Sequence, residues 1–240
     1  MRPYDGAVTS TSPSQPADPI GSERVRARWT RGLLITCLVV DLAGIASGLA
    51  QRALLLRMAA GEQVPTAVAQ ANDTRHAAIG KLQIIAFLIT VILWFAWQSR
   101  AYRNLRLVGS GKTRFTQGWA IGYWFIPFVN LVRPYQIIAD LWLRSENQNA
   151  DDTTTGRSAP TAVSLWWGGY LVAGIMGRVV MTMSLNATTI EQLQTATVAG
   201  MLGDALGVLS AFLAIRVVKG IDQYQQRFIP AVAGSSPGQV

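Results

Sequence analysis

Three charged side chains lie well away from the ends of long apolar runs, and they are the first candidates for chemistry: Asp41, Arg178 and Asp204. An ionised carboxylate is costly inside a bilayer. Asp41 therefore predicts either a proton or cation relay, or a protonated carboxyl that fixes helix packing. Arg178 and Asp204 lie thirteen positions before and after Glu191. In an antiparallel hairpin they would reach a similar depth, and we expect them to form a structural ion pair.

The counts of cysteine and histidine exclude several classes of enzyme. Cys37 and His76 are the single residues of their types. One of each allows neither an intramolecular disulfide nor a cysteine-based metal site nor a zinc-hydrolase motif. The spacing of the other polar residues shows no nucleophile and base pair and no paired catalytic carboxylates. The sequence thus implies no cofactor and no metal, and it leans against an enzyme.

Composition places the chain in a membrane. Hydrophobic residues make up 50% of the 240 residues, charged residues make up 14%, and the mean hydropathy is +0.26. The net charge is +8, but most Lys and Arg residues lie beside apolar segments rather than on a separate basic domain. That placement is typical of the topology signal of membrane proteins and disfavours a nucleic-acid partner.

Four apolar runs are long enough to cross a hydrocarbon layer of about 30 Å. They cover about residues 32–50, 79–97, 162–183 and 198–218. Residues 23–229 are therefore expected to form one membrane domain. Residues 1–22, rich in Ser, Thr, Pro, Asp and Gly, predict a disordered N-terminal tail, and residues 230–240 predict a flexible C-terminal tail.

The apolar segment of residues 118–132 predicts a different structure, because it contains Pro127 and Asn130. As a helix its length would be only about 22 Å. It would lie in the membrane interface, dip in and return, or cross. We expect Pro127 and Pro134 to break the helix, and Asn130 to satisfy the backbone groups that these breaks free.

The residues after Pro134 predict an amphipathic helix. One face carries Ile137, Ile138, Leu141 and Trp142, and this spacing suits a helix lying on the membrane. Together with the apolar segment of residues 118–132, this helix is expected to form an interfacial element over about residues 118–148.

The distribution of Lys and Arg residues favours a topology with four membrane spans over one with five. The chain has five Lys or Arg residues up to Arg31 and five in residues 98–116, but none in residues 184–197. If residues 118–132 do not cross, both basic segments and both termini are cytoplasmic, and the cation-free loop is outside. All eight Trp residues then lie near the cytoplasmic interface.

A basic stretch follows the second apolar run. Arg100, Arg103 and Arg106 recur every three residues with no acidic residue between 98 and 116. This pattern predicts attraction of anionic lipid headgroups or of an acidic partner, or else a topology determinant with no ligand. A membrane-protein partner and a homo-oligomer both remain open.

Two motifs together resemble a known family. Their defining residues are Trp97, Arg100, Arg103, Asn104, Trp119, Trp124, Phe125, Pro127, Asn130, Pro134 and Tyr135. Around them the chain resembles a bacterial membrane family catalogued as domain of unknown function 4328, over roughly all four spans. The resemblance implies a small multi-pass protein of the bacterial cell membrane. It implies no established activity, ligand or catalytic residue.

The expected fold class is an all-α integral membrane protein with four transmembrane helices and a cytoplasmic interfacial or re-entrant segment. The expected role is that of a non-enzymatic membrane-embedded interaction or accessory protein. The alternative is a small transporter or channel-forming subunit that uses Asp41. A third hypothesis is a membrane enzyme acting on lipid.

Overall fold

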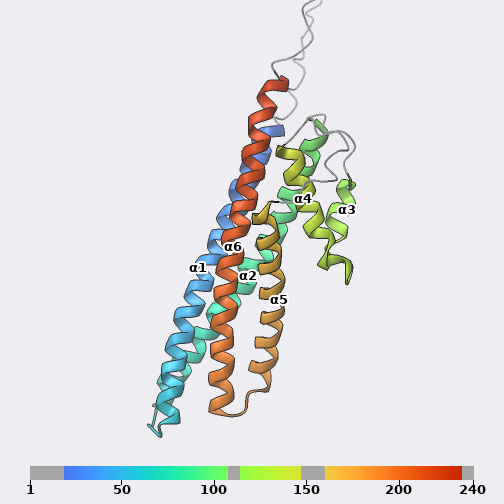
Figure 1. The fold of residues 1–240 in the computed structure, drawn as a ribbon. Coiled ribbons are helices and arrows are strands. Elements are labelled where there is room, and N and C mark those ends of the chain that lie inside the picture. The colour runs from blue at the N-terminus through green and yellow to red at the C-terminus, as the bar shows by residue number, and fades with distance from the viewer. Residues whose placement is uncertain (1–18, 108–113, 147–159, 234–240) are drawn as a thin grey trace, which may run out of the picture.

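The computed structural model describes residues 19–107, 114–146 and 160–233, and every element in these ranges is helical (Figure 1). The elements are α1 (Pro19–Ala59), α2 (Thr66–Leu107), α3 (Gln117–Gly122), the 3-10 helix η1 (Val129–Leu131), α4 (Arg133–Glu146), α5 (Thr161–Asn186) and α6 (Ile190–Ala233). Residues 1–18 and 234–240 of the two expected tails lie outside the described residues. The other residues expected in the tails belong to α1 and α6.

Four of the helices, α1, α2, α5 and α6, are long and apolar enough to cross a membrane. The predicted all-α fold with four membrane helices is thus confirmed. The longest of them, α1, α2 and α6, have 41, 42 and 44 residues. At 1.5 Å per residue each exceeds about 60 Å, twice the hydrocarbon thickness. The apolar runs in the sequence marked only the central parts of these helices, because their outer turns are polar.

The membrane helices form two antiparallel hairpins that pack through α1 and α6. In the first hairpin, the Thr30 hydroxyl donates to the Leu93 carbonyl oxygen at 3.2 Å. The turn between α1 and α2 is short, and Gly61 adopts a φ of +81°, a conformation that glycine tolerates best. Both turns lie at one end of the bundle, and α3 and α4 lie at the other (Figure 1).

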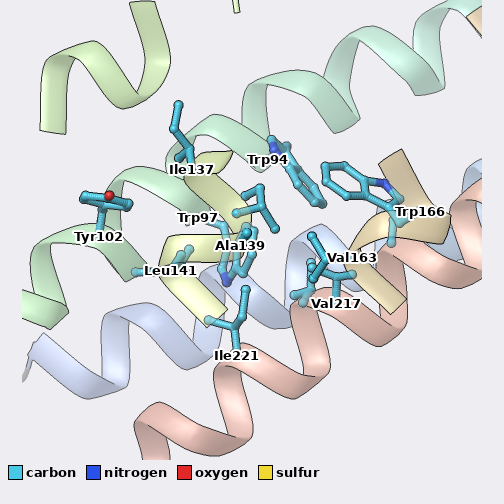
Figure 2. Packing of buried hydrophobic residues seen from close by; sticks show 14 of the residues in the cluster. Trp94, Trp97, Tyr102, Ile137, Ala139, Leu141, Val163, Trp166, Val217 and Ile221 are labelled. Carbon is cyan, nitrogen blue, oxygen red and sulfur yellow. The ribbon is translucent and has the colours of Figure 1, made fainter. Parts of the chain in front are cut away.

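Most of the buried hydrophobic residues gather at the α4 end of the bundle. Figure 2 shows side chains from α2, α4, α5 and α6 converging there, among them Trp97, Ile137 and Val217. We call α3, η1 and α4, together with the adjoining ends of α2, α5 and α6, the aromatic head. In the membrane helices, large apolar residues such as Ile92 and Ile175 remain mostly exposed. Such surfaces suit contact with lipid.

The structure corrects the expected position of the amphipathic helix. Ile137, Ile138 and Leu141 of α4 are fully buried in the protein, so its apolar face is not free to rest on a membrane. α4 contacts α6, α2 and α5. An amphipathic pattern requires an apolar neighbour but does not specify whether that neighbour is lipid or protein.

Candidate functional site

A cluster of three polar side chains lies in the middle of the membrane helices. Gln83 of α2 donates its amide hydrogens to Asp41 Oδ1 of α1 at 3.1 Å and to Asp204 Oδ1 of α6 at 2.8 Å. One carboxamide therefore bridges two carboxyl groups from separate helices. The amide has two N–H groups, so each carboxyl receives one of them.

Glycines make the room for both carboxyl groups. A Cβ atom on Gly207 of α6 would lie 2.5 Å from Asp41 Oδ2. A Cβ atom on Gly44 of α1 would collide with the Asp204 carboxylate and lie 2.9 Å from the Gln83 amide nitrogen. The arrangement is reciprocal, because each helix places its Asp against the glycine of the other. These small residues allow the close approach of α1 and α6.

The expected ion pair between Arg178 and Asp204 is not formed. Asp204 faces α1 and α2, whereas the Arg178 side chain is exposed. The face of α6 that meets α5 at this height carries Gly203, whose Cβ would lie 3.4 Å from Met176. Counting residues from the loop estimated the depth of each charge, but it could not give the direction in which each side chain points around its helix.

Two carboxyl groups that share one amide can hold a proton or a cation between them. Two ionised carboxylates so close together would repel each other and lose most of their hydration in a bilayer. A proton or a monovalent cation at Asp41 and Asp204 would remove that cost. Among the described residues, no group of three or more His, Cys, Asp and Glu side chains is arranged to hold a metal ion.

Aromatic rings form the centre of the aromatic head. Trp94 stacks on Trp166 with ring centroids 5.0 Å apart, and Trp124 meets Trp167 edge to face at 5.7 Å. Gln98, fully buried, accepts from the Trp94 indole N–H at 3.1 Å and donates to the Ala120 carbonyl oxygen at 2.8 Å. It thereby fixes α3 to α2.

Polar side chains join the outer parts of the aromatic head. The Tyr102 hydroxyl donates to Asp140 at 2.5 Å, and Asp140 also accepts from Arg144 at 2.8 Å. From α6, Gln225 donates to the Ala101 carbonyl oxygen at 3.1 Å and to Ser145 Oγ at 3.0 Å. Asn104 donates to the Gln225 oxygen at 3.4 Å. Because these groups are buried and paired, they make the head a defined structure.

The residues of the two sequence motifs divide into a buried set and a more accessible set. Trp97, Asn104 and Pro134 are buried, with Trp97 and Asn104 at 0% and 1% exposure. Arg103, Trp119, Phe125 and Pro127 are exposed, and Arg100, Trp124, Asn130 and Tyr135 are intermediate. Part of the motif therefore serves the folding of the head, and the rest is available to its surroundings.

Large apolar side chains project from α3 and from the segment that joins α3 to α4. We call Trp119, Phe125, Phe128, Leu131 and Val132 the keel. Phe125 and Phe128 are 71% and 85% exposed, and the other three are half exposed. Phe128 has a φ of +62°, the left-handed region that costs a bulky residue energy. The backbone thus holds an aromatic ring in an exposed position.

The keel backbone is held by groups other than the Asn130 side chain, which the sequence predicted for this role. The Asn130 side chain makes no hydrogen bond with the described residues. Instead, the Asn130 backbone N–H donates to the Ile126 carbonyl oxygen at 2.9 Å. The Trp167 indole N–H donates to the Leu131 carbonyl oxygen at 2.9 Å. Trp167 stands thirty-six positions from Leu131, so no local pattern in the sequence could reveal this contact.

Sequence reasoning missed several residues that organise these sites. Gln83 carried a signal, because an amide within an apolar run is as unusual as the nearby Asp41. Gln98 and Gln225 lie near the polar ends of apolar runs and look like surface residues in the sequence. Phe128 gave no signal, since only the backbone conformation distinguishes it from its apolar neighbours.

Comparison with known proteins identifies one family. A model described as "Domain of unknown function (DUF4328)" matches residues 60–223, more than half of the chain. The match begins after α1, so the expected coverage of all four spans was too wide. No curated protein and no solved structure matches. The matched residues include Gln83, Asp204 and the keel, and by this match the chain belongs to the DUF4328 family.

Proposed function

We propose that this protein is a non-enzymatic membrane-embedded interaction protein whose keel inserts into the cytoplasmic leaflet. The observation that carries the proposal is the exposure of five large apolar residues on a backbone held by Trp167 and Gln98. An apolar patch held open in this way marks a surface that meets lipid or protein. Lipid is favoured because the keel lies beside two membrane helices.

The depth of the keel supports contact with lipid. Phe125 meets Phe95 of α2 at 5.7 Å between ring centroids, and Trp124 meets Tyr170 of α5 at 6.3 Å. Tyr170 lies nine residues after Thr161, about 14 Å along α5. The tip of the segment is therefore level with membrane-facing turns of α2 and α5, and a short interfacial or re-entrant element accounts for this position.

Cations lie on the same part of the molecule as the keel. The Arg133 guanidinium lies over the rings of Phe115 and Tyr123, at 5.8 Å and 5.6 Å from their centroids. Arg103 and Arg114 are exposed. Each such cation near an anionic membrane surface contributes about 1 kcal/mol to attraction. Cations beside an apolar surface suit the cytoplasmic leaflet, and they support cytoplasmic ends for α1 and α6.

Spin labels can test the position of the keel. In a Cys37→Ser background, nitroxides are placed on Phe128→Cys, on Ile92→Cys as a lipid-facing reference, and on Arg114→Cys as an aqueous reference. In nanodiscs, we expect the Phe128 label to resemble the Ile92 label in its high collision rate with oxygen and low collision rate with a water-soluble nickel complex. If it resembles the Arg114 label instead, the keel is not in lipid and the proposal is wrong.

A second candidate function is a small transporter or channel-forming subunit. It is favoured by the single amide that bridges Asp41 and Asp204 at mid-membrane. If the site carries protons, proton flux in proteoliposomes should fall at least tenfold in Asp41→Asn. Asp73→Asn, which removes an exposed carboxyl of α2, is the matched control and should leave flux unchanged. Equal flux in both variants would contradict this candidate.

A further inference from the structure

A polar cavity lies between the ends of α1 and α6. Its volume is about 300 Å³. The α1 wall carries Arg24, Arg28 and Arg31, spaced so that they share one helical face, and the α6 wall includes Lys219 and Asp222. Figure 1 shows α1 and α6 side by side along one flank of the molecule, with α3 on the other. The cavity is therefore separate from the keel.

The cavity has an excess of positive charge. Arg31 is 3.7 Å from Asp222 Oδ2, which partly neutralises one of the four cations. Arg24, Arg28 and Lys219 form no ion pair with any described residue. Three cations converging on one small space attract an anion with several oxygen atoms, and phosphate has the geometry that guanidinium groups bind best.

The Asp222 carboxylate specifies more about the ligand. Asp222 is 4% exposed, and its Oδ1 atom is buried without a hydrogen-bond partner. A buried acceptor of this kind needs a donor, because a buried polar atom left without a hydrogen bond destabilises the fold. A phosphate ester with a hydroxyl group beside the phosphate supplies both parts: the phosphate for the cations and the hydroxyl for Asp222.

The height of the cavity along the bundle matches the level at which lipid phosphates are expected. Arg26 donates to the Ala96 carbonyl oxygen at 3.3 Å, which sets this part of α1 level with Trp94 and Phe95 of α2. Trp29, on the same turns of α1, is 64% exposed, as is usual for an indole in the interface. We propose that the cavity binds the phosphate of a hydroxylated glycerophosphate ester. This site does not depend on the role of the keel.

Native mass spectrometry can measure retention of phospholipids. The protein is released from nanodiscs that contain phosphatidylglycerol, phosphatidylmethanol and phosphatidylcholine. We expect one phosphatidylglycerol to be retained, and retention to fall at least tenfold in Arg28→Gln/Lys219→Gln. Arg216→Gln/Arg227→Gln removes the same charge from exposed α6 positions outside the cavity and should change retention less than twofold. An equal loss in both double variants would show diffuse attraction and overturn the proposal.

Two further measurements test whether Asp222 recognises the headgroup hydroxyl, and whether the bound phosphate belongs to a lipid or to a soluble molecule. Asp222→Leu, which keeps a similar shape but removes the acceptor, should abolish the preference for phosphatidylglycerol over phosphatidylmethanol, which has the same charge but no headgroup hydroxyl. An unchanged preference would refute the role of Asp222. Calorimetry with glycerol phosphate, in nanodiscs of phosphatidylcholine alone, tests a soluble source. If glycerol phosphate binds in these nanodiscs and Arg24→Gln weakens that binding, the site is supported with a soluble ligand. If neither phosphatidylglycerol nor glycerol phosphate binds, the proposal fails.

Discussion

The contacts of Asp41, Gln83 and Asp204 explain how two carboxyl groups are accommodated among apolar helices. Gln83 supplies a donor to each, and Gly44 and Gly207 supply the space. Isolated acidic groups in a bilayer are expensive, so partners and space are required together. Substitutions that remove only the space, or only the donor, should therefore both destabilise the fold.

Gly207→Ala should lower the free energy of unfolding by about 1–2 kcal/mol, because the new methyl group would meet Asp41 Oδ2 at 2.5 Å and force α1 and α6 apart. Thermal unfolding in detergent can measure this loss. Gly80→Ala is the matched control, since its Cβ would meet nothing within 4 Å. The control should be neutral or slightly stabilising through helix propensity. Equal stability of the two variants would show that α1 and α6 adjust without strain.

Gln83→Leu should lower the free energy of unfolding by about 2 kcal/mol or more, because it removes the donor to both carboxyl groups. Gln51→Leu is a suitable control. The Gln51 side-chain oxygen is buried without a partner, so replacing it should be neutral or stabilising. In a double-mutant cycle, Gln83→Leu and Asp204→Asn should show a coupling of about 1 kcal/mol. Strict additivity would mean that the observed bridge does not contribute.

The sequence predicted the four membrane helices, because a hydrophobic run of sufficient length has few alternatives to crossing a bilayer. It did not predict what each face of each helix packs against. α4 was expected against lipid and packs against protein, and Asp204 was expected against Arg178 and meets Gln83. Hydropathy and residue counting report burial and depth. The pairing of faces depends on contacts between residues far apart, such as the 121 positions between Gln83 and Asp204.

A tryptophan on α5 makes one of the hydrogen bonds that hold the keel segment. Trp167→Phe removes the N–H that binds the Leu131 carbonyl oxygen but keeps an aromatic ring. We expect at least about fivefold faster hydrogen exchange in residues 124–132, which corresponds to a lost hydrogen bond of about 1 kcal/mol. Exchange in α1 and α6 should not change, because neither helix depends on this bond.

Trp166→Phe is the matched control for Trp167→Phe. Trp166 is buried beside it, at 4% exposure, and its indole N–H makes no hydrogen bond with the described residues. This variant loses a similar amount of packing, so it should reduce overall stability without a selective change in residues 124–132. The same exchange pattern in both variants would show that packing of the rings, rather than the bond to Leu131, holds the keel.

At the level of the whole bundle, an even number of membrane helices puts both described chain ends and the aromatic head at one end (Figure 1). The two short turns lie at the other end. The cations also gather near the head, where α1 contributes Arg24, Arg28 and Arg31. The positive-inside rule then predicts that the head is cytoplasmic. The arrangement of the helices is observed, whereas this orientation is a prediction.

Cysteine labelling in intact cells can determine the orientation, in a Cys37→Ser background. Gln63→Cys, in the turn between α1 and α2, and Asn186→Cys, at the end of α5, are both exposed and should react with a membrane-impermeant maleimide. Arg114→Cys, in the head, should react only after the cells are opened. The reverse pattern would place the head outside. It would then remove the physical reason for proposing that the keel and the cations beside it face the anionic cytoplasmic leaflet.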